Sequence, residues 1–226
     1  MGPHAREISS EVFQVGGQGL TAPEDAAIYL LTVGAEAALI DAGCGRATDL
    51  LLANIEAAGV APASIRWLLL THCHFDHTGG AEEVRRRLGC ITVAHELDAT
   101  FIEAGDAEVS AACWYDSRLT PCPIDRKLRG ERESLLLGTS TIEALHIPGH
   151  SPGSVAYVFE SGGRRILFGQ DVHGPLAASL RSNAAHYQQS LQTLLAQQAD
   201  ILCEGHYGIF QGRREVAAFI RRFVET

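Results

Sequence analysis

The sequence predicts an α+β fold in which helices pack outside a system of largely antiparallel or mixed β-sheets. Two observations carry this prediction: short apolar runs alternate with amphipathic segments, and some pairs of runs are joined only by tight polar turns. The chain has 226 residues, which is enough to bury a sizeable core. Because it contains no linker, repeat or low-complexity tract, we interpret residues 1–226 as one domain.

Apolar runs bounded by turn residues predict the strands. The run at 67–70 is continuously apolar, which is typical of a strand covered on both faces. Two pairs of runs each flank a short turn that contains glycine and serine, and we expect both pairs to form β-hairpins. The expected strands are 67–70, 135–137 paired with 142–147, 155–159 paired with 166–168, and 201–203.

Apolar residues at helical spacing predict four helices outside these sheets. Gly59 and Gly89 follow the first two helices and are expected to end them, since glycine commonly follows the last helical residue. The expected helices are 47–58, 81–88, 187–195 and 216–223.

Charge and hydropathy restrict the partners. The formal net charge is −9, whereas a nucleic-acid-binding protein needs clustered Lys and Arg to neutralise phosphates. The arginine runs at 85–87 and 221–222 lie in predicted helices and are interpreted as solvated faces. No apolar run approaches the ~20 residues of a membrane span, and residues 1–10 lack the apolar segment of a secretory signal. We therefore expect no nucleic-acid partner and no membrane partner.

Six cysteines occur without a C-x-x-C pair and without the spacing of a disulfide framework. We interpret them as reduced thiols, which favours a cytoplasmic protein. Cys113 and Cys122 could reach each other, and the sequence leaves open whether they are bonded.

The segment 71–80 contains a dense set of metal-ligand side chains: His72, His74, Asp76 and His77 occupy six positions just after an expected buried strand. In extended backbone His72 and His74 point the same way, while Asp76 and His77 follow where the loop bends into the next helix. Imidazole nitrogens and carboxylate oxygens are ligands that divalent cations such as zinc bind in proteins. The segment therefore predicts a metal site, with room for a second metal.

Three further candidates, His150, Asp171 and His206, have matching local settings. Each follows a short apolar run and a glycine. If these strand ends converge on one rim, the three side chains join the 71–80 segment in one site. Taken singly, each has a structural explanation, as a hydrogen-bonded histidine or as an aspartate in a turn.

The order of these seven residues resembles the ligand pattern of the metallo-β-lactamase superfamily, most closely its glyoxalase II-like and lactonase-like branches. The resemblance extends over roughly 12–224. It implies a four-layer αβ/βα sandwich, in which two mixed β-sheets lie face to face and are flanked by helices. By this resemblance one metal is held by His72, His74 and His150, the other by Asp76, His77 and His206, and Asp171 bridges them.

Asp41 also matches a position near the site of that superfamily. The resemblance implies that it supports a ligand through hydrogen bonds rather than binding metal. The alternative is an aspartate that forms a turn after a strand.

The resemblance further implies a hydrolase with two divalent metal ions, zinc first, with iron and manganese as the other choices. A hydroxide bridging the metals would attack an ester, thioester or lactone of a small molecule, and Asp76 would orient it and carry a proton to the leaving group. The alternatives are an iron-dependent oxidoreductase of the same fold, similar to persulfide dioxygenases, a non-catalytic metal-binding module, or a phosphodiesterase or nuclease, which the negative charge disfavours.

Substrate contacts are expected from His173, Tyr187 and Tyr207. His173 and Tyr207 lie near ligands in the sequence. Tyr187 lies on the predicted helix before the His206 strand, and its helical register with Leu191 favours core packing instead.

Residues 105–133 form a polar stretch between the two halves of the ligand set and contain Trp114 and Tyr115. This stretch is interpreted as a lid or substrate loop. A surface segment or the contact of a homodimer is an equally good interpretation.

Overall fold

Two β-sheets organise residues 2 and 4–225, the part of the chain that the computed structural model describes. In the first sheet, neighbouring strands are antiparallel over its first four members and parallel from there to its far edge. The sheet is therefore mixed. In spatial order its strands are β1 (Arg6–Ser9), β2 (Val12–Gly16), β3 (Ile28–Val33), β4 (Glu36–Ile40), β5 (Ile65–Leu69), β6 (Ile91–His95) and β7 (Arg126–Leu128).

The second sheet is also mixed, since one of its neighbouring pairs is parallel and the others are antiparallel. The parallel pair joins two strands that are separated in sequence by a helix. In spatial order the strands are β13 (Ile209–Gln211), β12 (Ile201–Glu204), β11 (Arg164–Gln170), β10 (Val155–Ser161), β9 (Ser140–His146) and β8 (Arg132–Leu137).

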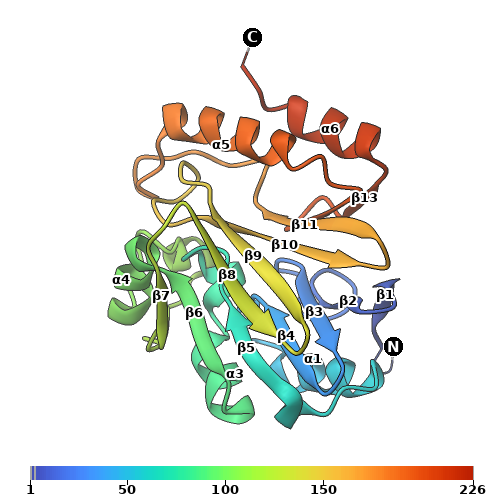
Figure 1. The fold of residues 1–226 in the computed structure, drawn as a ribbon. Coiled ribbons are helices and arrows are strands. Elements are labelled where there is room, and N and C mark those ends of the chain that lie inside the picture. Colours follow the sequence, from blue (N-terminus) through green and yellow to red (C-terminus); the bar gives the residue numbers. More distant parts are fainter. Residues whose placement is uncertain (1, 3, 226) are drawn as a thin grey trace.

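Helices cover the outer face of each sheet, which produces four layers (Figure 1). Apolar side chains of three helices pack on the first sheet, and those of two helices pack on the second. The first three are α1 (Thr48–Ala57), α3 (Ala81–Leu88) and α4 (Glu96–Ala104), and the other two are α5 (Ala184–Ala196) and α6 (Arg213–Arg221). Shorter helical turns are η1 (Pro62–Ser64), α2 (Phe75–Thr78) and η2 (Ala112–Tyr115).

The space between the sheets is filled by large side chains from both of them. Tyr29 of the first sheet meets Phe168 of the second with 5.4 Å between ring centroids, and Tyr157 and Phe159 lie in the same cluster. Each fully buried side chain of this size stabilises the fold by roughly 1.5–3 kcal/mol. Because this packing fixes one sheet against the other, loops from both sheets keep their positions along the shared edge.

The predicted fold class is confirmed, and each expected strand and helix overlaps an observed one. Both expected hairpins are present, as β8–β9 and β10–β11. Gly89 adopts φ +65° directly after α3, the conformation that ends a helix at low cost for glycine. The sequence did not predict the strands before residue 41, β6, β7, β13, the helices α2 and α4, or the turns η1 and η2.

The stretch 105–133 is partly built into the fold. It contains η2 and also β7, whose parallel pairing with β6 makes it the edge strand of the first sheet. Cys113 is exposed and Cys122 is buried, and both are free thiols. Among the helices that are described, none is long and apolar enough to cross a membrane.

Candidate metal centre

The candidate ligands lie on loops that leave strands of both sheets. The segment after β5 carries four of them, two in its loop and two in α2, while His150, Asp171 and His206 follow β9, β11 and β12. These loops bring all seven residues together in two groups that share Asp171. Within each group the candidate ligand atoms lie within 4.8 Å of one another. We call His72, His74 and His150 the imidazole group, and Asp76, His77 and His206 the mixed group.

The imidazole group brings three ring nitrogens together. His72 Nε2 lies 3.0 Å from His74 Nδ1 and 3.2 Å from His150 Nε2. Nitrogens bound at about 2.1 Å to a tetrahedral cation are roughly 3.4 Å apart, close to this spacing. His150 Nδ1 lies 2.9 Å from the carbonyl oxygen of Pro175, which can only accept, so Nδ1 donates and Nε2 keeps its lone pair for the site.

The mixed group combines imidazoles with carboxylates. His206 Nε2 lies 3.1 Å from Asp76 Oδ2, and His77 Nε2 lies 3.1 Å from Asp171 Oδ1. On its other side, His77 Nδ1 donates to Asp41 Oδ2 at 2.7 Å. That hydrogen bond orients the His77 ring so that Nε2 faces the carboxylates.

Asp171 lies between the two groups. Its Oδ2 is 3.5 Å from His150 Nε2, and its Oδ1 is 3.4 Å from His206 Nε2. Oδ2 therefore faces the imidazole group and Oδ1 faces the mixed group, which is the arrangement that a bridging ligand requires.

Burial and neighbouring charges shift the pKa values in opposite directions in the two groups. Burial, reinforced by the neighbouring imidazoles, holds the pKa values of His72 and His74 well below the ordinary value. Burial also acts to lower the pKa of His77, but Asp171, Asp41 and Asp76 outweigh it and raise that pKa well above the ordinary value. The imidazole group thus offers neutral lone pairs, and the mixed group favours a positive charge.

The donor set fits divalent cations. His77 Nε2 and Asp171 Oδ1 are buried and have no hydrogen-bond partner among the described residues, although they face the shared centre. Buried polar atoms are rarely left without a partner, and a cation between them would satisfy both. Nitrogen and oxygen donors without cysteine suit zinc, iron and manganese.

The profile of the metallo-β-lactamase superfamily matches residues 22–206 of this chain, which includes all seven candidate ligands. The chain belongs to the metallo-β-lactamase superfamily. A hydroxyacylglutathione hydrolase from Anaeromyxobacter dehalogenans is 38% identical to it over 141 residues, which cover 62% of this chain and 44% of that relative. An acyl-coenzyme A thioesterase from Gallus gallus is 27% identical over 92% of this chain and 82% of its own length.

A solved metallo-β-lactamase from Novosphingobium pentaromativorans superposes with a TM-score of 0.82 at 24% identity, over 98% of this chain and 88% of that one. At this identity the likeness shows the shared fold alone. The chain spans about half the length of the first curated relatives that it matches.

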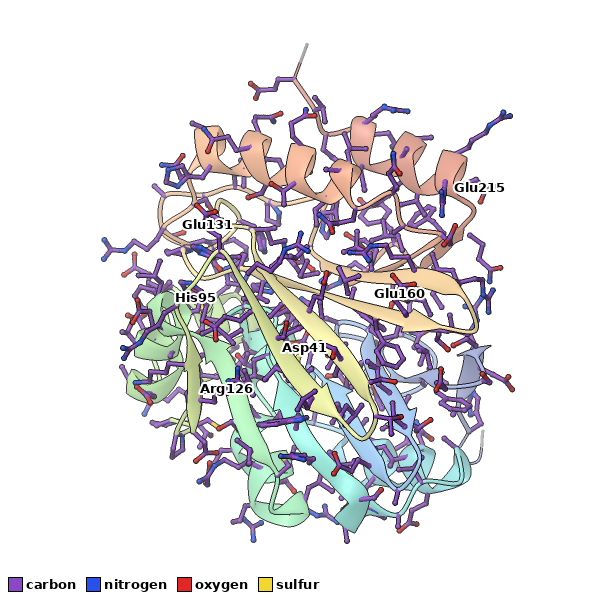
Figure 2. All side chains as sticks on the ribbon, in the orientation of Figure 1. Asp41, His95, Arg126, Glu131, Glu160 and Glu215 are labelled. Carbon is purple, nitrogen blue, oxygen red and sulfur yellow. The ribbon has the colours of Figure 1, made fainter. Side chains whose placement is uncertain are left out.

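Asp41 of this superfamily member lies close to the centre of the molecule and is buried (Figure 2). Besides His77, its carboxylate accepts hydrogen bonds from the backbone N–H and the hydroxyl of Thr71, both at 2.8 Å. It takes φ +63°, a conformation that is uncommon outside glycine. The side chain thus ties β4 to the ligand loop that follows β5.

Glu204 is a buried acid that the sequence analysis missed. Its Oε1 accepts from His173 Nδ1 at 2.8 Å, and its Oε2 accepts from the backbone N–H groups of His206 and Tyr207. It is fully buried, so these bonds fix both the His206 loop and the His173 ring. The available signal was a charged residue that ends an otherwise apolar strand.

The predicted substrate residues take different positions. His173 faces a cleft beside the mixed group, and Tyr207 lies next to it, with ring centroids 4.8 Å apart, in an adjoining cavity of about 320 Å³. Tyr187 does not reach the cleft, because it is buried and its hydroxyl donates to the carbonyl oxygen of Val172. The cleft measures about 200 Å³ and is lined by His74, Asp76, Ala111, Trp114, Tyr115, Asp171, His173, Pro175, Leu180 and His206.

Proposed function

We propose that this protein is a metal-dependent hydrolase that binds two divalent cations and cleaves small-molecule acyl thioesters, or related esters and lactones. The observation that carries the proposal is the position of Asp171, with one oxygen toward each group of ligands. The names of the relatives, a glutathione thioester hydrolase and an acyl-coenzyme A thioesterase, favour thioesters among these substrates.

The imidazole group would hold one cation and the mixed group the other, with Asp171 shared. Bound cations would supply Lewis acidity, which polarises a carbonyl group and lowers the pKa of water towards ~7. Zinc is our first choice, and iron and manganese fit the same donors.

Asp76 is proposed to transfer a proton from the attacking water to the leaving group. It lines the cleft, and although burial raises the pKa of its carboxyl group, His77 and His206 outweigh burial and lower it. Asp76 is therefore ionised, so it can orient an attacking water molecule, accept its proton and pass that proton to the departing thiol or alcohol.

The cleft beside Asp76 would hold the acyl group. Pro175, Leu180 and Trp114 provide apolar surface there, and the Trp114 side chain is more than half exposed. Because His173 Nδ1 donates to Glu204, its Nε2 is the free nitrogen and can accept a hydrogen bond from substrate. Tyr207 is proposed to contact the leaving group from the adjoining cavity, while Tyr187 has no substrate role in this proposal.

The stretch 105–133 contributes Ala111, Trp114 and Tyr115 to the cleft. We therefore favour its interpretation as a substrate loop over that of a dimer contact. The apolar area that these residues present suits a small acyl group better than a charged polymer.

The test is a substrate panel assayed on protein loaded separately with zinc, iron and manganese, with metal content measured. The panel contains glutathione and coenzyme A thioesters, lactones and a phosphodiester, and a persulfide is assayed by oxygen consumption. We expect thioester hydrolysis. Oxygen uptake with the persulfide and no hydrolysis would replace the proposal with the oxidoreductase alternative.

Asp76→Asn tests the proton role. Turnover should fall by about 10²–10⁴-fold while substrate binding persists, because general acid–base catalysis contributes in that range. Asp49→Asn is the matched control, since the Asp49 side chain is almost fully exposed on α1. Near-normal turnover in Asp76→Asn with two cations bound would rule this mechanism out.

A further inference from the structure

Asp98 is a fully buried aspartate on α4 that is not a candidate metal ligand. Its carboxylate accepts three hydrogen bonds. The backbone N–H of Gly153 donates to Oδ1 at 2.6 Å, the backbone N–H of Cys73 donates to Oδ2 at 2.8 Å, and the Ser151 hydroxyl donates to Oδ2 at 2.6 Å. Both oxygens of Asp98 are therefore occupied.

The three donors belong to the two loops that carry the imidazole group. Cys73 stands between His72 and His74, and Ser151 directly follows His150. The first loop leaves β5 of the first sheet, whereas the second joins β9 to β10 in the second sheet. One carboxylate thus ties together loops from opposite sides of the sandwich.

The second loop is shaped around this carboxylate. A Cβ at Gly153 would lie 2.5 Å from Asp98 N and 2.8 Å from Asp98 Cβ, so only glycine allows the approach. The Ser154 hydroxyl lies 2.8 Å from the Ser151 hydroxyl and accepts from the Ser151 backbone N–H at 3.1 Å. These contacts hold Ser151 in place for its bond to Asp98.

A carboxylate is a costly choice for this position. Burial raises the pKa of Asp98, and the opposing contributions come from hydrogen bonds with Ser151, Gly153 and Cys73. A buried charge without a cationic partner is unfavourable, and an apolar side chain would pack there at lower cost. A carboxylate is, however, the group that accepts on two oxygens from donors on two loops.

We propose that Asp98 is a positioning residue for the imidazole group. It holds His72 and His74 at a fixed distance from His150, so that the three ring nitrogens converge before a cation binds. Preorganisation of this kind strengthens binding because the loops need not be ordered when the ligand arrives. The inference rests on the proposed function only in that a cation occupies the imidazole group.

The test compares Asp98→Asn with Asp200→Asn. Asparagine keeps the volume of Asp98 but replaces one acceptor oxygen with a donor. At Oδ1 this removes the bond from Gly153, and at Oδ2 it removes the bond from Cys73 and disturbs that from Ser151. Asp200 is the control because its carboxylate accepts from the Arg165 backbone N–H and from the Arg213 side chain, away from the ligand loops. Ser151→Ala is a milder variant that removes one of the three bonds to Asp98, together with the contact between the Ser151 and Ser154 hydroxyls.

The first readout uses metal-free protein. Amide hydrogen exchange at Cys73 and Gly153 should accelerate in Asp98→Asn by more than any change in global stability explains, and should stay at the wild-type rate in Asp200→Asn. Global stability is measured in parallel by urea unfolding, because a purely structural role would move exchange and global stability together. If exchange and global stability change together in Asp98→Asn, the inference is overturned.

The second readout is a zinc titration followed by calorimetry. Asp98→Asn should weaken binding at one of the two sites by about 10–100-fold, the range found when support of a ligand is removed. Ser151→Ala should do so by less. Wild-type affinity at both sites in Asp98→Asn would overturn the inference. If the wild-type protein binds no metal, the proposed function fails, and hydrogen exchange alone then decides whether Asp98 positions the loops.

Discussion

The two halves of the candidate centre differ in charge and in exposure. The imidazole group is buried, its His72 and His74 have lowered pKa values, and its loops are tied together by Asp98. In the mixed group, His206 has about a third of its side chain exposed, and nearby carboxylates raise its pKa to about 10 although burial opposes them. We infer that the first half anchors one cation and that the second faces incoming substrate and water.

Both groups draw on segments that follow strands of both sheets, so this difference comes from their surroundings. The two loops of the imidazole group are joined to each other through Asp98, which restrains them. The mixed group takes Asp76 and His77 from α2 and His206 from the loop after β12, beside the cleft. Local flexibility is thus expected on the side where substrate must enter.

Asp171→Ala should have the largest effect, because this carboxylate serves both halves. We expect weaker binding of both cations and a fall in turnover of roughly a thousandfold, which corresponds to about 4 kcal/mol of lost transition-state stabilisation. Metal content after dialysis and steady-state kinetics measure the two effects. If the variant keeps two cations and wild-type turnover, Asp171 does not serve both groups.

His150→Ala and His206→Ala form a pair that separates the two halves. Each should lose one cation and keep the other. In metal-free protein, His150→Ala should lower the free energy of unfolding by about 1–3 kcal/mol, since His150 is buried, and His206→Ala by about 0.5 kcal/mol or less. Urea unfolding checks this, and equal losses would mean that the two halves are equally embedded.

Asp41→Asn should affect the mixed group most. The Asp41 carboxylate holds His77 Nδ1, so its loss should weaken cation binding there by about 10–100-fold. Calorimetric titration should show a smaller loss at the imidazole group, which Asp41 reaches only through Thr71. A matching loss at both groups would show that Asp41 supports the whole edge instead.

His95→Gln should give the smallest effect, through α4. His95 precedes that helix and accepts from the Leu97 backbone N–H, and its ring stacks on His146 at 3.8 Å. Burial and His146 lower the pKa of His95 to about 4, against an opposing contribution from Glu133. Protons therefore favour the unfolded chain between pH 6.5 and 4, and stability that is present above pH 6.5 is lost as the pH falls towards 4.

The loss should be on the order of 1 kcal/mol. It is measured as the difference in unfolding free energy between wild type and His95→Gln at pH 7 and at pH 4.5. That difference should shrink in acid. If the unfolding free energies of the two proteins change in parallel with pH, His95 does not stabilise α4.

The sequence singled out the candidate ligands that the fold brings together, but not most of the residues that support them. His72, His74, Asp76 and His77 are visible because four ligand types crowd into six positions, and the other three share one local setting. Asp98 and Glu204 carry no such signal, since each is a single acid in an ordinary helix or strand. The partners of Asp98 lie far away along the chain, as Gly153 does, and Glu204 combines the distant His173 with its near neighbours His206 and Tyr207.

Tyr187 shows what helical periodicity can and cannot predict. The sequence allows a substrate contact from the helix before the His206 strand, while the helical register of Tyr187 with Leu191 favours the core. The side chain lies in the core, and its hydroxyl donates to the carbonyl oxygen of Val172. Helical spacing indicates that a residue is buried, but it does not say what the polar end of the side chain meets.

By itself the sequence determined the fold class, about half of the strands, the long helices except α4, and the residue types able to bind metal, because hydrophobic periodicity and ligand chemistry are local properties. Only the tertiary structure decided which loops meet, which oxygen of Asp171 faces which group, and that Asp98 joins two sheets. Those facts depend on the packing of one sheet against the other, where contacts form between residues far apart in the chain.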